Sequence, residues 1–133
     1  MEKLDKLFDL VKKAQSYSYA PYSKFNVGSC IISTSGNYYS GANIENAAYP
    51  QGCCAEASAI SVMIMAGENK IKEIGVIGMG ELLCTPCGGC RQRIREFGDS
   101  STLIHIFSHS GYKKTFTLSE LLPESFGPDN LVN

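Results

Sequence analysis

The chain has 133 residues, 44% of them hydrophobic and 19% charged, which fits one globular domain over residues 1–133 and excludes a disordered chain. Twelve lysines and arginines against thirteen aspartates and glutamates leave a net charge of −1, so the composition provides no general attraction for nucleic acid or an anionic membrane. The sequence shows no export signal and no apolar run that could span a bilayer, so we expect a cytoplasmic protein whose six cysteines are reduced.

The first part of the chain predicts a helix followed by a strand hairpin. Apolar residues recur at helical spacing through residues 3–15. Residues 27–33 and 38–43 have the composition of strands, and the turn residues 35–37 between them are typical of a hairpin. Residues 44–52 follow no regular period, so we expect an irregular segment there.

The second part alternates helices and strands. We expect helices at residues 54–65 and 88–97, each followed by a glycine that ends it. Strands are expected at residues 71–79, 102–107 and 112–118, before a short helix and an aromatic tail. Helices interleaved with strands predict an α/β fold, a three-layer α/β/α sandwich with a mixed sheet of about five strands.

Most of the cysteines fall into two tight clusters, Cys53 with Cys54 and Cys84 with Cys87 and Cys90. Both clusters lie where a helix begins, and a helix N-terminus favours anions such as thiolates. Clustered thiols in a reducing compartment indicate metal or redox chemistry. We expect the sixth cysteine, Cys30, and also Cys53 to be core residues, because free cysteines are usually buried.

Several sites other than a catalytic metal centre are compatible with these spacings. A finger-type zinc site would use Cys87, Cys90, His105 and His109, but a strand would hold those histidines roughly 13 Å apart. An iron–sulfur cluster would use Cys84, Cys87 and Cys90; the sequence has no fourth cysteine at the usual spacing, and the distant Cys53 or Cys54 would have to complete the set. A thioredoxin-like redox pair would leave the first cluster without a role.

A catalytic zinc centre uses both clusters. Cys54, Cys87 and Cys90 would supply three thiolates and leave one position for water, with Glu56 two residues after the first ligand. This two-part pattern is typical of zinc-dependent nucleobase deaminases. The alternative in another class is a noncatalytic zinc module whose site is closed by a fourth protein ligand.

Further stretches resemble the cytidine deaminase family, whose members act on free nucleosides. The resemblance runs through APYSKFNVG (20–28), NIENAAYP (43–50), the two cysteine motifs and ELLPESFGP (120–128). It implies a cytidine deaminase-like fold and hydrolytic deamination of cytidine and deoxycytidine in pyrimidine salvage. It also implies one Zn²⁺ per subunit and no organic cofactor. The segment NIENAAYP distinguishes the chain from polynucleotide-editing deaminases, the rival within the same chemistry.

The resemblance assigns the substrate contacts residue by residue. Asn43 and Glu45 are implied to hold the ribose hydroxyls, Phe25 to pack against the pyrimidine, and the Ala55 backbone N–H to face the base carbonyl. The family is mostly homotetrameric, with active sites shared between subunits. In such an assembly three residues reach a neighbour's site: Ala47, Tyr49 and Phe126.

The same resemblance implies that zinc lies on Cys54, Cys87 and Cys90 and that Glu56 shuttles protons. One departure concerns the charge of this centre. Family members often carry an arginine directly after the glutamate, where it bonds the zinc thiolates, and this sequence has Ala57 there. Three thiolates around a dication leave a net charge of −1. We expect the helix N-termini and Arg91, which follows the last ligand, to offset it.

Overall fold

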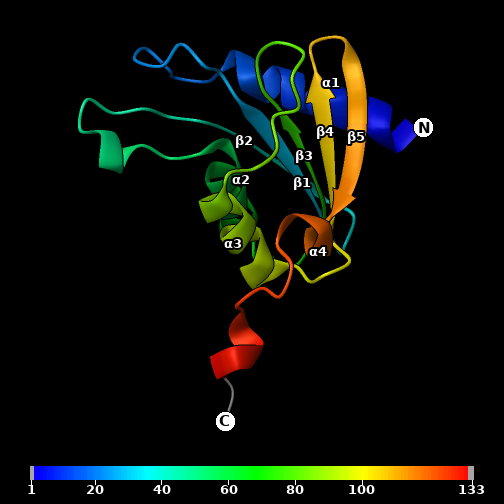
Figure 1. The fold of residues 1–133 in the computed structure, drawn as a ribbon. Helices are drawn as coiled ribbons and strands as arrows, with labels where there is room; N and C mark the ends of the chain where they lie inside the picture. Colours follow the sequence, from blue (N-terminus) through cyan, green and yellow to red (C-terminus); the bar gives the residue numbers. More distant parts are fainter. Residues whose placement is uncertain (1, 132–133) are drawn as a thin grey trace.

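Within residues 2–131, which the computed structural model describes, five strands form one mixed sheet in the order β2-β1-β3-β4-β5 (Figure 1). The strands are β1 (Gly28–Ser33), β2 (Tyr38–Ala42), β3 (Ile71–Ile77), β4 (Leu103–Ser108) and β5 (Gly111–Thr117). The helices are α1 (Glu2–Ser16), α2 (Ala55–Met65), α3 (Gly88–Phe97) and α4 (Leu118–Leu121), with 3₁₀ turns at Tyr49–Gln51 and Pro128–Leu131. Strands β3 and β4 run parallel, and the other neighbours run antiparallel.

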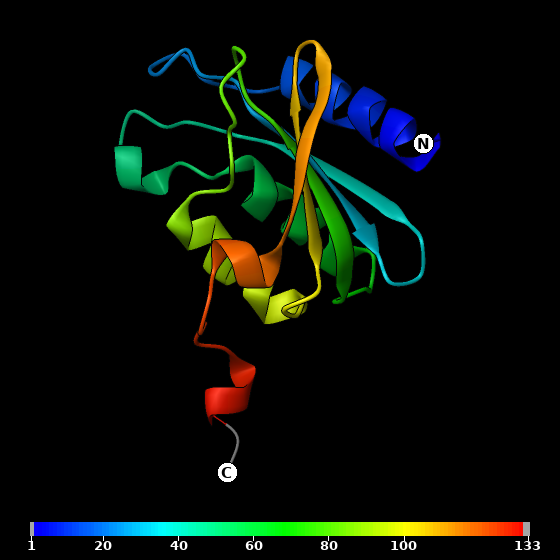
Figure 2. The ribbon, with the colours of Figure 1, turned by 45° about the vertical axis from the view of Figure 1, so that its right-hand side comes forward.

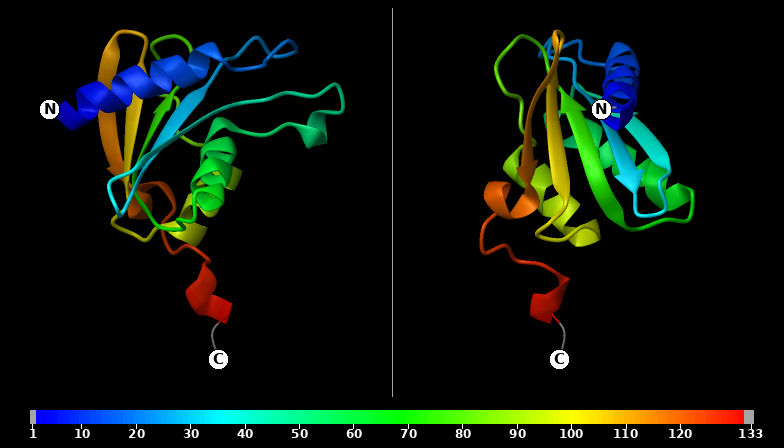
Figure 3. Two further views of the ribbon diagram at one scale, coloured as in Figure 1. Left: turned by 180° about the vertical axis from the view of Figure 1, so that it is seen from behind. Right: turned by 90° about the vertical axis from the view of Figure 1, so that its right-hand side faces the viewer.

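Helices cover both faces of this sheet. Helix α1 crosses one face, whereas α2 and α3 lie against the other, as the two views in Figure 3 show. The prediction of a three-layer α/β/α sandwich with a mixed sheet is therefore confirmed. Among residues 2–131, no helix combines the length and the apolar character that a membrane span requires.

The alternation of side chains along β1 divides the core into two halves. Cys30 and Ile32 pack on the α1 side with Leu7, whereas Ile31 packs on the other side with Met63 of α2. Cys30 is fully buried, which confirms the expectation that it is a core residue. Each helical layer thus has its own apolar contact with the sheet, and the layer of α2 and α3 is packed on the sheet through the half of the core that contains Ile31 and Met63.

A glycine sets the distance between α2 and the sheet. A Cβ added at Gly41 of β2 would lie 2.3 Å from the backbone nitrogen of Ala59, closer than any side chain allows. The absence of a side chain at this position lets the helix backbone rest directly on the strand. The first turn of α2, which carries Cys54, Ala55 and Glu56, is placed by this contact.

The structure explains the end of α3 and the start of α4 by contacts that the sequence did not predict. Helix α3 ends at Gly98 as predicted, but this glycine has φ −122° rather than a left-handed conformation. The position needs glycine for space, since a Cβ there would lie 2.4 Å from Thr102 Oγ1. The short last helix begins at Leu118, where Thr117 and Glu120 form a capping box that the sequence analysis did not identify.

The chain beyond α4 leaves the body of the fold and ends in the 3₁₀ turn Pro128–Leu131 (Figure 2). Gln92 on α3 holds this tail by donating a hydrogen bond of 2.8 Å to the Phe126 carbonyl. The Phe126 side chain itself is 57% exposed. The contact of Phe126 with α3 is therefore made by its backbone, and its aromatic ring stays available.

Candidate metal and catalytic site

Two of the candidate ligands occupy the N-cap positions of two neighbouring helices. Cys54 caps α2 with φ −73° and ψ 157°, and Cys87 caps α3 with φ −66° and ψ 169°. Cys90 follows as the third residue of α3. N-cap positions usually carry polar side chains, because the unpaired amides of the first helical turn attract negative charge. Thiolates at these two positions would be stabilised by the positive ends of both helices.

The three thiols meet at one point. The Sγ atoms of Cys54, Cys87 and Cys90 all lie within 4.8 Å of one another, and they form the only such group of potential metal ligands in residues 2–131. Three sulfur donors suit zinc, which prefers thiolates and keeps a water position open where it has three protein ligands. The donor set therefore fits the metal that the sequence predicts.

The histidines and Cys84 stand apart from this cluster, which excludes the finger-type and iron–sulfur interpretations. His105 Nε2 lies 2.7 Å from Glu73, and its Nδ1 lies 2.7 Å from Thr115, so both ring nitrogens are engaged elsewhere. His109 pairs with Glu81 at 2.7 Å on the surface. Cys84 is half-buried and does not join the three clustered thiols.

The electrostatics of the cluster favour a bound cation. Burial raises the pKa of Cys54 and Cys90, and negative charge on the neighbouring thiols and on Glu56 raises it further. The pKa of Cys87 is lowered, chiefly by the backbone amide of Cys90. Ionising all three thiols without a cation would therefore be unfavourable. A dication supplies the compensation, and its binding would release protons.

Glu56 lies beside the thiols on the second residue of α2. It is only 5% exposed, and this burial raises its pKa, while the Cys90 thiol and Arg93 act in the opposite direction. A carboxyl with a raised pKa exchanges protons near neutral pH more readily than an ordinary glutamate. The arrangement thus combines a metal centre with an acid–base group.

The structure corrects the expectation for Arg91. Its guanidinium donates to the Pro86 carbonyl at 2.7 Å, the Leu121 carbonyl at 2.7 Å and Thr85 Oγ1 at 3.0 Å. These bonds fasten the loop before α3 to the end of α4, and none of them is made to one of the clustered thiols. Arg93, for which the sequence suggested no role at the site, donates from Nη1 to Cys90 Sγ at 3.6 Å. The available signal was its spacing of three residues from Cys90 on a helix.

The expectation for Cys53 is wrong. Cys53 is exposed, and its backbone forms an isolated bridge with Ile44 outside the sheet. Ser58 donates a hydrogen bond of 3.6 Å to its sulfur. Cys53 is therefore neither a core residue nor a member of the thiol cluster.

Glu45 faces a cavity of about 380 Å³ lined by Tyr22, Ser23, Glu45, Asn46, Tyr49 and Gly52. Its carboxylate accepts hydrogen bonds from the backbone amides of Tyr22 at 2.9 Å and Ser23 at 3.1 Å, and from the Ser23 hydroxyl. These bonds lower the pKa of Glu45, the Ser23 hydroxyl having the largest effect. The carboxylate is thus held ionised at the edge of a cavity.

Asn43 is more deeply engaged than Glu45. Its Oδ1 accepts from the Ser18 hydroxyl and from the Val27 amide at 2.9 Å, and its Nδ2 donates to the Phe25 carbonyl at 2.8 Å. One N–H of the amide remains for a ligand. Asn43 therefore fixes the segment that carries Phe25, in addition to any contact with substrate.

The other predicted substrate contacts are exposed, except for Ala55. The Phe25 ring, 41% exposed, borders Gly78, where an added Cβ would lie 3.1 Å from it. Ala55 is buried as the first residue of α2, whereas Ala47 and Tyr49 are exposed. Phe126 lines neither the cavity beside Glu45 nor the thiol cluster of its own chain.

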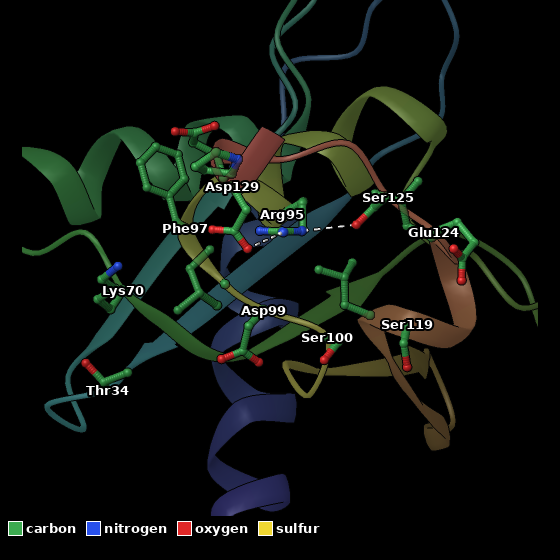
Figure 4. A pocket seen from close by; sticks show the side chains of 16 residues that line it. Thr34, Lys70, Arg95, Phe97, Asp99, Ser100, Ser119, Glu124, Ser125 and Asp129 are labelled. Carbon is green, nitrogen blue, oxygen red and sulfur yellow. Dashed lines mark hydrogen bonds and ion pairs between the residues drawn. The ribbon is translucent and has the colours of Figure 1, made fainter. Parts of the chain in front are cut away.

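A larger cavity, of about 600 Å³, lies between α3, α4 and the C-terminal tail (Figure 4). Arg95 crosses it, donating to Ser125 Oγ at 3.0 Å and pairing with Asp129 at 3.6 Å. Its lining contains no cysteine and neither Glu45 nor Glu56. This cavity therefore lies against the C-terminal tail and is separate from the candidate metal site and from the cavity beside Glu45.

Comparisons with known proteins identify the family of this chain. The family model described as the cytidine and deoxycytidylate deaminase zinc-binding region matches residues 1–106. A cytidine deaminase from Sporosarcina psychrophila is 37% identical over 128 residues, covering 96% of this chain and 94% of the relative. The crystal structure of cytidine deaminase from Burkholderia pseudomallei is similar with a TM-score of 0.87 at 32% identity, covering 92% of this chain and 98% of that one. The enzyme from Mycobacterium tuberculosis gives a TM-score of 0.79 at 29% identity, over 92% of this chain and 96% of that one.

Proposed function

Since the chain belongs to the cytidine and deoxycytidylate deaminase family, we propose that it hydrolyses cytidine and deoxycytidine to uridine and deoxyuridine, with release of ammonia. The observation that carries the proposal is the convergence of three thiols at two helix N-termini beside the buried carboxyl of Glu56. That combination provides a metal centre and a proton carrier in one place.

Cys54, Cys87 and Cys90 would hold the zinc ion. When bound, zinc lowers the pKa of a water molecule towards neutrality and so supplies a nucleophile. The rest of the centre belongs to the protein. The helix N-termini favour the thiolates of the two N-cap cysteines, and the buried position of Cys90 fixes the third sulfur relative to Glu56.

Glu56 performs the proton transfers. It accepts a proton from the attacking water and delivers one to ring N3 while the water oxygen bonds to C4, which becomes tetrahedral. It then takes the remaining proton of the C4 hydroxyl and passes it to the amino nitrogen, and the bond between C4 and that nitrogen breaks as the C4 carbonyl forms and ammonia leaves. One carboxyl acts first as base and then as acid, which requires a pKa nearer neutrality than that of an exposed glutamate.

The substrate would lie between the thiol cluster and the cavity beside Glu45. The ribose hydroxyls donate to Glu45 and meet the free N–H of Asn43, and the Phe25 ring packs on the pyrimidine. The backbone N–H of Ala55 belongs to the first helical turn, whose amides lack intrahelical partners, and it donates to the base carbonyl. These contacts orient C4 towards the metal centre.

The proposal includes a homotetramer with shared active sites. Ala47, Tyr49 and Phe126 are exposed in the single chain, with 75% of Tyr49 and 57% of Phe126 accessible, as residues that reach a neighbour's site would be. It also includes a cytoplasmic role in pyrimidine salvage, because a reducing compartment keeps the three thiols available for metal.

Initial rates on cytidine, deoxycytidine, free cytosine and a short single-stranded oligonucleotide, at equal concentrations and with the zinc content measured, test this function. We expect turnover of both nucleosides. Free cytosine should react about 10⁴-fold less well, because it leaves the sugar-binding groups unpaired. Comparable kcat/KM on the oligonucleotide would establish an editing deaminase instead. Bound zinc without turnover of any of these would favour the noncatalytic zinc module.

A further inference from the structure

Arg93 reaches back along α3 to the thiol cluster. It lies three residues after Cys90, and its Nη1 donates to Cys90 Sγ at 3.6 Å. Long side chains on a helix lean towards its N-terminus, which brings this guanidinium over the first turn of α3. Within residues 2–131, no other lysine or arginine donates a side-chain hydrogen bond to one of the clustered thiols.

The first turn of α3 leaves room for this guanidinium. Gly89 lies directly beneath it, and a Cβ added there would come within 3.3 Å of Arg93 Nη1. Apart from Cys90, Arg93 has no hydrogen-bond or ion-pair partner among the described residues, whereas Arg91 and Arg95 each bond elsewhere. The contact with the thiol is therefore the main interaction that fixes its head group.

The charge of the cluster calls for such a group. Three thiolates around a dication carry a formal charge of −1, Ala57 offers no charge, and Arg91 is occupied by the Pro86 and Leu121 carbonyls. We propose, on the basis of the function above, that Arg93 is the positioning residue that offsets this charge, by a charge-assisted hydrogen bond to the Cys90 thiolate. The pKa of Arg93 is raised, first by its hydrogen bond to Cys90 and then by the charge of that thiol, which agrees with this pairing.

A hydrogen bond to a thiolate has consequences that a purely structural role would lack. It lowers the energy of the sulfur lone pairs, so the thiolate-to-metal charge-transfer band of a cobalt-substituted centre lies at shorter wavelength. It also favours the anionic cluster over the protonated thiols, so the metal is retained to lower pH. Outer groups of this kind typically contribute about 10–100-fold to metal affinity or activity.

The test compares Arg93→Gln with the wild type and with Arg95→Gln, the same change two residues further along α3 and away from the thiols. In Arg93→Gln we expect the cobalt band to shift to longer wavelength, zinc to be lost at higher pH and kcat to fall about 10–100-fold with little change in KM. Arg95→Gln should keep the wild-type band and zinc-release pH. Circular dichroism and thermal melting verify that both variants fold.

Two further variants sharpen the assignment. Arg93→Lys keeps the charge without the planar donor group and should give an intermediate band position and release pH. Ala57→Arg added to Arg93→Gln places a guanidinium beside the cluster from α2, and it should restore much of the zinc retention.

The outcomes separate this inference from the proposed function. An unchanged band and release pH in Arg93→Gln would overturn the inference, whether or not the wild type deaminates cytidine. A wild type that binds neither zinc nor cobalt would overturn the metal centre and the inference together. A wild type that binds metal without deaminating cytidine would refute the function alone, and the cobalt comparison would still decide the role of Arg93.

Discussion

The thiol cluster and the segment that carries Glu45 are built in opposite ways. The cysteines and Glu56 stand in the first turns of α2 and α3, which rest on the sheet through Gly41 and an apolar core. Glu45 lies in an irregular segment joined to its surroundings by isolated bridges at Ile44, and its neighbours Ala47 and Tyr49 are exposed. The cysteines of the first region come together within a single chain on packed helices, whereas the second region is an exposed irregular segment.

This difference assigns the reacting groups to the first region and the groups that recognise the substrate to the second. Helix N-termini fix the reacting groups to within small tolerances, whereas loops hold the groups that select a substrate and accept contributions from other subunits. Changes in the first region should therefore reduce kcat or remove the metal, and changes in the second should act mainly on KM and on the choice of substrate.

Loss of a ligand should have the largest effect. Cys87→Ala or Cys90→Ala removes one of three converging sulfurs, and we expect loss of both zinc and activity, as measured by metal analysis and cytidine turnover. Cys84→Ala is the matched control, since Cys84 is close to these ligands in the sequence but does not belong to the three converging thiols. This variant should keep both zinc and activity. Stoichiometric zinc in Cys90→Ala would contradict the ligand assignment.

Glu56→Gln should have the next largest effect. The change preserves shape but removes the proton carrier, so we expect kcat to fall by at least about 10²–10⁴-fold while zinc stays bound. Steady-state turnover with a parallel zinc determination measures this. Retention of more than about a tenth of the wild-type kcat would show that another group carries the protons.

A change in the second region sharpens the comparison. Glu45→Gln weakens the acceptor for the sugar hydroxyls, and a hydrogen bond to a charged group contributes about 1.5–3 kcal/mol, or roughly 10–150-fold. We expect KM for cytidine to rise within that range with kcat less affected, and discrimination against free cytosine to narrow. A fall in kcat at constant KM would place Glu45 with the reacting groups and break the distinction.

Glu68 gives the smallest expected effect, on stability alone. Hydrogen bonds from Ser35, Tyr39 and Asn37 lower its pKa from 4.5 to about 2, and they join the β1–β2 turn to the end of α2. Because the folded pKa is the lower one, this stabilisation is complete above about pH 4.5 and is lost as the pH falls towards 2. Glu68→Gln should be less stable at pH 7 and lose less stability on acidification, with kcat/KM unchanged. Thermal melts across this pH range measure the difference, and a parallel acid response in both proteins would refute it.

The sequence predicts the features that depend on short spacings. Cys87 and Cys90 are separated by two residues and Cys54 and Glu56 by one, so each pair is placed by a single helical turn once the helix start is known. The order of helices and strands followed from apolar periodicity, and the structure confirms the sandwich. The burial of Cys30 was also predicted correctly, from the usual burial of free cysteines.

Side-chain direction was beyond the sequence. Arg91 and Arg93 lie on the same short helix, and only their orientation decides that Arg91 bonds the Pro86 carbonyl while Arg93 meets the Cys90 thiol. Cys53 was assigned to the core from the usual burial of cysteine, whereas it lies exposed in a segment that is joined to its surroundings by an isolated bridge with Ile44. The Arg91–Leu121 and Ile44–Cys53 contacts join separate segments, which local composition does not encode, whereas the only sequence signal for the Arg93–Cys90 contact is a spacing of three residues on one helix.

Cys54 precedes α2 and Cys87 precedes α3, so the whole of α2 and β3 lies between these two cysteines in the sequence. A metal ion bound to both would close this segment into a loop, as a covalent cross-link does, and would remove conformational freedom from the unfolded chain. Amide hydrogens in the first turns of α2 and α3 should then exchange with solvent more slowly in the loaded protein, while those of α1, on the far face of the sheet, provide an internal reference. Acquisition of the metal and final ordering of the helical layer would become a single folding event.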